Sequence, residues 1–137
     1  MRTENADDPE RFAQRYSVSA NPAQLAAELE VLGSDHQANG YTTVDQADRM
    51  STALGLKPGR ILVDLGAGCG WPGLYMAAST GCSVLSIDPV AEGGATARDR
   101  VAADDLAPPS AAVQADAEAI PLRSRSVDAI VHGDVLC

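Results

Sequence analysis

Long hydrophobic runs are absent from this chain, which argues against a membrane protein. No apolar stretch approaches the roughly 20 residues that a transmembrane helix needs. The first residues are charged, where a signal peptide would carry an apolar core. We therefore expect a cytoplasmic protein that does not engage a membrane. Lysine occurs only once, at Lys57, beside abundant alanine and arginine, and this composition is typical of bacteria with GC-rich genomes.

Positive charge is also scarce. Ten basic residues stand against 19 acidic ones, which gives a formal net charge of -9. Such a surface repels phosphate backbones, so we do not expect nucleic acid as a partner. The three cysteines, Cys69, Cys82 and Cys137, show no metal-binding spacing, and no metal site is expected. The length of 137 residues suits a single domain.

The pattern that is present alternates short apolar runs with helical segments. Strands are expected at 60–65, 83–88, 111–115 and 127–132, and helices at 72–81 and 91–106, the latter weakened by Gly93 and Gly94. This order predicts an α/β fold with a doubly wound parallel sheet of about four strands.

The segment before the expected sheet has helical signals. Phe12 and Tyr16 are spaced to share a helical face. A helix is expected between Asn21 and Gly33, with Leu25, Leu29 and Leu32 on one stripe. Another begins at a capping box formed by Thr43 and Gln46. We expect residues 1–42 to form an N-terminal helical extension and residues 43–137 to form the main domain.

The most informative segment is 61–73 (ILVDLGAGCGWPG), in which an apolar strand runs into an acid and a glycine-dense turn. Glycines let a ligand approach the backbone where no Cβ intervenes, with free N–H groups pointing at it. The carboxylate of Asp64 would repel the pyrophosphate of a dinucleotide and attract an amino-acid ammonium group. This favours S-adenosylmethionine over NAD as the cofactor.

Acidic residues also follow the second and third expected strands. Asp88 ends the second strand and Asp116 follows the third. The carboxyl ends of parallel strands meet at one edge of the sheet, where such folds bind ligands. Asp88 is placed to accept hydrogen bonds from two ribose hydroxyls. Asp116 is placed to accept one from an adenine amine, with Ala117 and Ile120 against the ring.

Four blocks occur in order at 63–70 (VDLGAGCG), 87–89 (IDP), 115–122 (ADAEAIPL) and 126–131 (SVDAIV). Together they resemble the class I S-adenosylmethionine-dependent methyltransferases, most closely the small-molecule group called type 11. The resemblance covers about residues 58–137 and implies a Rossmann-like fold. The cofactor-binding residues that we expect are Asp64, Gly66, Ala67, Gly68, Gly70, Asp88, Pro89, Asp116, Ala117 and His132.

The resemblance also bears on the substrate. Methyltransferases of nucleobase amines typically carry Asn/Asp-Pro-Pro-aromatic after the fourth strand, whereas residues 132–135 read HGDV here. With the acidic charge, this favours a small-molecule methyl acceptor. No catalytic residue is assigned: His132 and Asp134 lie where a base would meet substrate, but direct methyl displacement depends mainly on alignment.

The chain is shorter than the family fold, and two other functions also fit its sequence. The family fold continues through three further strands, so we expect a truncated chain whose fourth strand is an open edge able to pair with a second copy. A truncated, non-catalytic remnant that binds the cofactor is one alternative function. An NAD-dependent oxidoreductase is another, because residues 68–73 (GCGWPG) also fit the G-x-G-x-x-G pattern.

Overall fold

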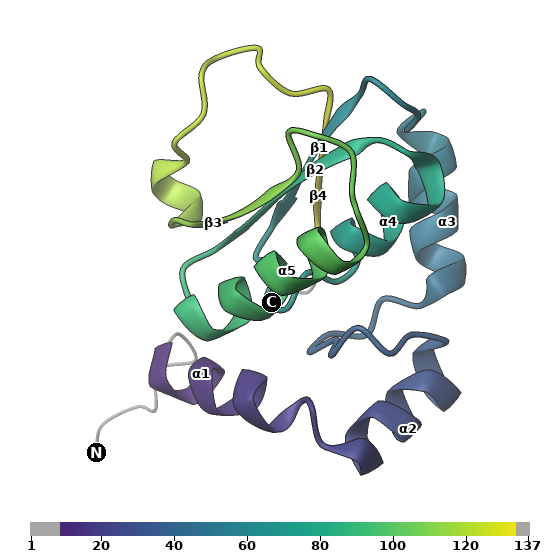
Figure 1. Cartoon of the computed structure of the whole chain (residues 1–137), viewed down its shortest axis with the longest axis vertical. Helices are drawn as coiled ribbons and strands as arrows, with labels where there is room; N and C mark the ends of the chain where they lie inside the picture. The colour runs from purple at the N-terminus through teal and green to yellow at the C-terminus, as the bar shows by residue number, and fades with distance from the viewer. Residues whose placement is uncertain (1–8, 134–137) are drawn as a thin grey trace.

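A computed structural model of the chain describes residues 9–133 (Figure 1). Four strands form one parallel sheet in the order β3-β2-β1-β4: β1 (Ile61–Leu65), β2 (Ser83–Asp88), β3 (Ala111–Gln114) and β4 (Ala129–His132). The expected parallel sheet is confirmed. Residues 1–8 and 134–137 lie outside the described residues, and with them Asp134, Cys137 and the first of the charged residues at the start of the chain.

Five α-helices and one 3-10 helix accompany the sheet in the described part. They are α1 (Pro9–Val18), α2 (Pro22–Leu32), α3 (Val44–Ala53), α4 (Gly73–Thr80), α5 (Ala91–Ala103) and η1 (Ala117–Ala119). The longest of them, α5, has 13 residues. Within residues 9–133 no helix is long and apolar enough to cross a bilayer.

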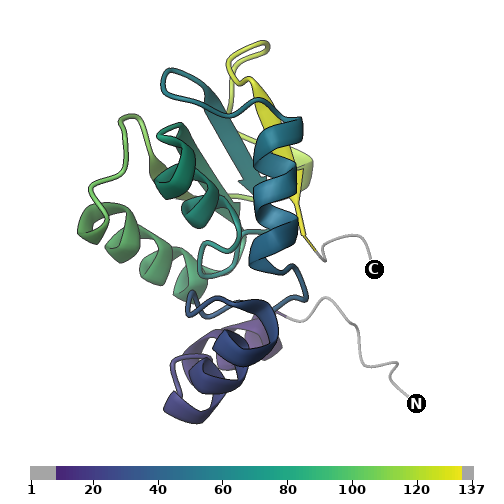
Figure 2. The same ribbon diagram turned by 90° about the vertical axis from the view of Figure 1, so that its right-hand side faces the viewer.

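Side chains of the sheet alternate between its two faces. Leu62, Val84 and Ala129 are neighbours in the strand register and join the main core with residues of α3, α4 and α5. Figure 2 shows α4 and α5 on one side of the sheet. On the other face Ile87 is buried, whereas Ile130 of β4 is 52% exposed. The described part of the sheet is therefore covered more fully on the helical face.

The helix ends follow the sequence signals, but one apolar stripe does not. Both hydrogen bonds of the capping box between Thr43 and Gln46 are present. Gly33 ends α2 with φ 77° and donates its N–H to the carbonyl of Leu29. The predicted stripe on α2 is wrong, because Leu32 is buried while Leu29 is 58% exposed. Leu32 is the one buried residue of α2, and most of the other residues of this helix are exposed. Figure 1 shows α2 at the end of the molecule away from the sheet.

Candidate cofactor site

The carboxyl ends of the strands meet at one edge of the sheet, and α1 lies across that edge (Figures 1 and 2). Asp64 lies in β1 next to its last residue, Asp88 ends β2, and Asp116 follows shortly after β3. The carboxylate of Asp88 is close enough to contribute to a raised pKa of Asp64. The three acids singled out in the sequence therefore lie along one edge.

Asp64 is fully buried, with 0% of its surface exposed. Its Oδ2 accepts a hydrogen bond from the Gly73 N–H at 2.8 Å, which ties β1 to the first residue of α4. Its Oδ1 has no hydrogen-bond partner in the described part of the chain. The same holds for the hydroxyl of Ser86, the neighbour of Asp64 in the β1–β2 register. Two orphaned polar atoms thus lie in the interior behind the turn.

Burial raises the pKa of Asp64 to about 8, although the hydrogen bond from Gly73 acts in the opposite direction. At pH 7 the carboxyl is therefore mostly protonated. The repulsion of a pyrophosphate expected from the sequence does not operate in this state, because that expectation assumed an ionised, accessible carboxylate.

The N–H groups of the glycine turn also differ from the sequence expectation. They were expected to be free for a ligand, but most donate hydrogen bonds within the protein. The N–H groups of Gly66 and Ala67 donate to the carbonyl of Ile87, and that of Gly70 donates to the carbonyl of Ala67. The N–H groups of Gly68 and Gly73 donate to the side chains of Asp88 and Asp64. The turn therefore offers few donors to a phosphate, and this disfavours a dinucleotide.

Asp88 connects the turn to β2. Its Oδ2 accepts from the Gly68 N–H at 2.8 Å, and its Oδ1 accepts from the Val90 N–H at 2.8 Å. Burial raises the pKa of Asp88, while these two hydrogen bonds lower it. A carboxylate oxygen accepts about two hydrogen bonds. Each oxygen of Asp88 therefore has a second acceptor position beyond its backbone donor.

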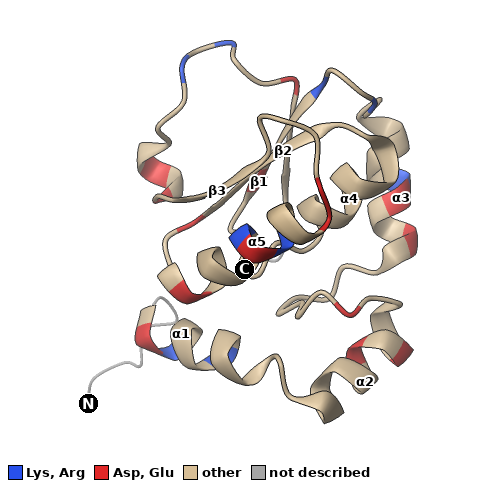
Figure 3. Ribbon diagram, in the orientation of Figure 1, with Lys and Arg blue, Asp and Glu red and all other residues tan. Residues whose placement is uncertain are grey.

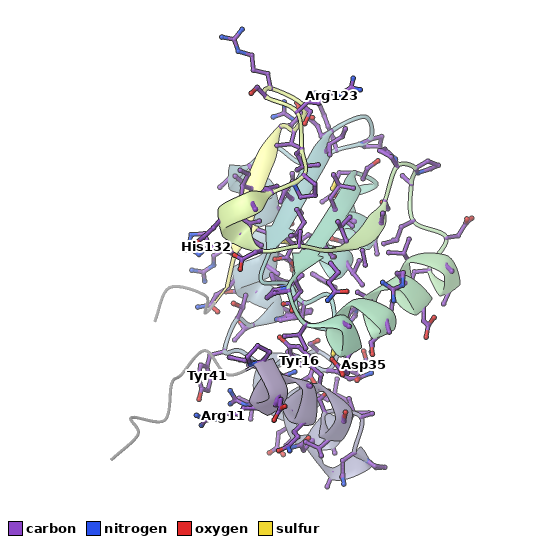
Figure 4. The ribbon with its side chains drawn as sticks, turned by 90° about the vertical axis from the view of Figure 1, so that its left-hand side faces the viewer. Arg11, Tyr16, Asp35, Tyr41, Arg123 and His132 are labelled. Carbon is purple, nitrogen blue, oxygen red and sulfur yellow. The ribbon has the colours of Figure 1, made fainter. Side chains whose placement is uncertain are left out.

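Tyr16 of α1 contacts both Asp88 and the glycine turn, and the sequence did not predict this. Its hydroxyl donates to Oδ2 of Asp88 across a long distance of 3.5 Å. A Cβ placed on Gly68 would lie 3.2 Å from both Cε1 and the hydroxyl oxygen of Tyr16, so the ring covers this glycine. Figure 4 shows Tyr16 between α1 and the strand ends. The only sequence signal was its spacing from Phe12.

The remaining expected residues lie at the surface of the described part of the chain. Asp116 is exposed, and its Oδ1 accepts from the Glu118 N–H at 3.0 Å, which caps η1. Pro89 and Ala117 are exposed as well. His132 is exposed at the end of β4 (Figure 4) and pairs with Leu65, so its side chain lies on the sheet face opposite Asp64. The structure thus brings Asp64, the turn and Asp88 together and leaves these four at the surface.

Helix α5 reaches the turn at Gly93. A Cβ on Gly93 would lie 2.7 Å from the carbonyl oxygen of Gly68, whereas one on Gly94 meets nothing closer than Arg98 Nη1 at 3.7 Å. We expect Gly93→Ala to lower the free energy of unfolding by about 1–3 kcal/mol, because backbone must move. Gly94→Ala should raise it by roughly 0.5–1 kcal/mol through helix propensity.

Urea denaturation of the two variants measures this difference. Each variant is the control for the other, since both place the same methyl group on adjacent positions of one helix. Equal effects of the two substitutions would contradict the close approach of α5 to the turn.

Several solved structures share this fold. A methyltransferase from Thiobacillus denitrificans in complex with S-adenosyl-L-homocysteine is 24% identical with a TM-score of 0.57, and the match covers 66% of this chain and 36% of that one. A putative methyltransferase from Methanococcus maripaludis is 19% identical with a TM-score of 0.62, covering 96% and 52%. Geranyl diphosphate methyltransferase in complex with GPP and sinefungin is 20% identical with a TM-score of 0.63, covering 90% and 54%.

The present chain therefore spans between about a third and a half of the length of these proteins. No curated protein sequence matches it. Its own sequence nevertheless matches one protein family over residues 63–137, more than half of the chain, and the family is described as "Methyltransferase domain". The matched region begins within β1 and includes the turn, Asp88 and Asp116. By this match, the chain belongs to the methyltransferase domain family.

Proposed function

We propose that this chain binds S-adenosylmethionine at the carboxyl edge of its sheet and takes part in methyl transfer to a small-molecule acceptor. The observation that carries the proposal is the state of Asp88. Its carboxylate is held in place by the N–H groups of Gly68 and Val90, and each oxygen can accept from a second donor, which for Oδ2 is the Tyr16 hydroxyl at 3.5 Å in this structure. Two such positions on one carboxylate suit the two hydroxyls of a ribose.

The interior behind the turn supports the same assignment. Oδ1 of Asp64 and the hydroxyl of Ser86 are orphaned acceptors, and an ammonium group is a donor of three hydrogen bonds. A neighbouring cation would also favour the ionised form of Asp64. Because Asp64 is fully buried, such a contact requires the turn near Gly73 to open. An anionic pyrophosphate would find no positive charge there.

The cofactor supplies a methyl group on a positively charged sulfur, which leaves as a neutral thioether. The residues of this chain bind and orient. Asp88 would hold the ribose, the backbone at Gly68, which carries no Cβ, would lie against the cofactor, and Asp116 with Ala117 would border the adenine. Alignment of reactants of this kind accelerates a displacement without a catalytic base. We assign no catalytic residue.

The nature of the acceptor is inferred from charge. Acidic residues are distributed over α1, α2, α3, α5 and η1 (Figure 3), and the net charge is -9. A polyanionic substrate would be repelled, so a small molecule is favoured. We further propose a cytoplasmic bacterial protein in which residues 1–42 form an extension of a cofactor-binding unit at 43–137. Pairing of two copies would use β4, at the end of the strand order, where Ile130 is exposed.

A binding experiment tests the cofactor. S-adenosylhomocysteine, the demethylated product, is expected to bind the purified chain in a calorimeter and to raise its melting temperature. At 100 times its Kd, a ligand that binds only the folded state adds about 2.7 kcal/mol to the free energy of unfolding. NADH at the same concentration is expected to leave the melting temperature unchanged.

The converse result, a thermal shift with NADH and none with S-adenosylhomocysteine, would show that the proposed cofactor is wrong. Binding alone does not establish methyl transfer. Transfer of a labelled methyl group from S-adenosylmethionine to an added small-molecule acceptor in a single turnover distinguishes an enzyme from a protein that only binds the cofactor.

A further inference from the structure

The acceptor position that a ribose hydroxyl needs beside Asp88 is occupied in this structure by Tyr16. The Tyr16 hydroxyl faces Oδ2 of Asp88 at 3.5 Å, on the oxygen that already accepts from Gly68. Burial, and next the charge of Asp88, raise the pKa of Tyr16, so its hydroxyl stays protonated and acts as a donor. A ribose hydroxyl is also a donor, so the two groups require the same place.

The tyrosine ring also occupies the approach to the turn. A Cβ on Gly68 would lie 3.2 Å from Cε1 and 3.3 Å from Cζ of Tyr16, and one on Gly93 would lie 3.0 Å from Cδ2. The ring is thus in contact with the backbone at both glycines. The bare backbone that would admit a ligand at Gly68 is covered by a phenol.

The attachment of α1 to the rest of the chain is small. Tyr16 packs in a cluster with Cys69 and Val90, supported by Phe12 and Ala13, and this cluster is separate from the main core around Leu62. Segments held by few buried apolar contacts open at low free-energy cost. Displacement of α1 therefore does not require the sheet to unfold.

We propose that Tyr16 is a residue of the cofactor site that competes with the ribose, so that the cofactor must displace the tyrosine ring from Asp88 and Gly68 in order to bind. This inference rests on the proposed function, and it adds an affinity-determining residue. The observed affinity is then the intrinsic affinity reduced by the fraction of molecules whose site is free of Tyr16. Removing the competitor should strengthen binding.

Calorimetry with S-adenosylhomocysteine tests the competition. We expect Tyr16→Phe, which removes the donor and keeps the ring, to lower the Kd by about threefold, and Tyr16→Ala, which clears the site, to lower it by about tenfold. Tyr75→Phe is the matched control, because the Tyr75 hydroxyl donates to Asp48 at 2.9 Å on the outside of α3 and α4. Its Kd should equal that of the unmodified chain.

A spectroscopic readout reports the displacement directly. The chain has three tyrosines, Tyr16, Tyr41 and Tyr75, so 3-fluorotyrosine labelling gives three fluorine resonances that single Tyr→Phe variants assign. Saturation with S-adenosylhomocysteine should move the Tyr16 resonance toward the position of solvent-exposed fluorotyrosine and leave that of Tyr75 in place. This measurement uses the unmodified sequence and does not depend on the stability of Tyr16→Ala.

The possible outcomes separate this inference from the proposed function. If S-adenosylhomocysteine binds but the Tyr16 resonance stays in place, or if the Kd of Tyr16→Phe is unchanged or higher, Tyr16 does not compete and the inference is overturned. If the ligand binds Tyr16→Ala and not the unmodified chain, the competition is confirmed in its strongest form. If neither binds, the proposed function fails, and this inference fails with it.

Discussion

Replacing Asp64 with asparagine is expected to make the unliganded protein more stable at pH 8 by several kcal/mol and to flatten the dependence of its stability on pH. In the folded chain burial raises the pKa of Asp64 to about 8 from an ordinary value of 3.8. Asparagine has nearly the same shape and still offers an oxygen to the Gly73 N–H, but it does not ionise. The cost of ionising a buried carboxyl is therefore removed.

The direction of this pH dependence follows from the protons that the folded and unfolded chains bind. Between about pH 4 and pH 8 the unfolded chain loses the proton of Asp64 while the folded chain retains it. The free energy of unfolding then falls by about 1.4 kcal/mol for each pH unit of increase in this range. The stability that depends on the proton of Asp64 is fully present below the pKa of Asp64 in the unfolded chain. It is lost once the pH passes the pKa of Asp64 in the folded chain. Burial also raises the pKa of Asp88, so a smaller slope of the same sign should remain in Asp64→Asn.

Urea denaturation at pH 5, 6.5 and 8 measures how the free energy of unfolding changes with pH in Asp64→Asn and in the unmodified chain. Asp116→Asn serves as the control, because it makes the same chemical change on an exposed carboxylate at the same edge of the sheet. Parallel slopes for Asp64→Asn and the unmodified chain would show that Asp64 does not retain its proton in the folded state.

Gly70→Ala is expected to lower the free energy of unfolding by about 3–5 kcal/mol. Gly70 has φ 102°, a conformation that is strained for a residue with a Cβ. Its Cβ would also overlap Cδ1 of Leu74 and lie 2.6 Å from Cγ of the same side chain. Leu74 is fully buried in the main core, and side chains in protein interiors are closely packed.

Gly59→Ala separates the cost of backbone strain from the cost of crowding Leu74. Gly59 has φ 87°, but a Cβ there meets nothing within 4 Å. This variant should lose only about 1–2 kcal/mol from backbone strain, and the difference from Gly70→Ala is the cost of crowding Leu74. Equal losses, measured by the same denaturation experiment, would mean that the turn relaxes away from α4.

The sequence predicted the sheet well because local and global signals agree there. The apolar runs at β1 and β2 are bounded by glycine, proline or acid, and such runs are typical of buried parallel strands. Thr43 and Gln46 predicted the start of α3 because both of their hydrogen bonds are local. For the same reason Gly33 predicted the end of α2.

The state of the site was less predictable because it depends on residues far apart in the sequence. Hydrogen bonds from the turn to Ile87, Asp88 and Asp64 use the N–H groups that the glycine pattern predicted to be free. The protonation of Asp64 depends on complete burial, which no local pattern reports. Tyr16 lies 72 residues from Asp88 in sequence. The spacing of aromatic residues on a helix indicates a packed face but not what that face covers.

The position of Trp71 gives the protein a built-in optical reporter. It is the single tryptophan of the chain, lies within the glycine turn and is 7% exposed. Its indole N–H donates to the carbonyl of Thr42 at 2.9 Å, and its ring lies 5.4 Å from that of His36. Any opening of the turn alters these surroundings, so the wavelength of indole emission follows the motion without an added label.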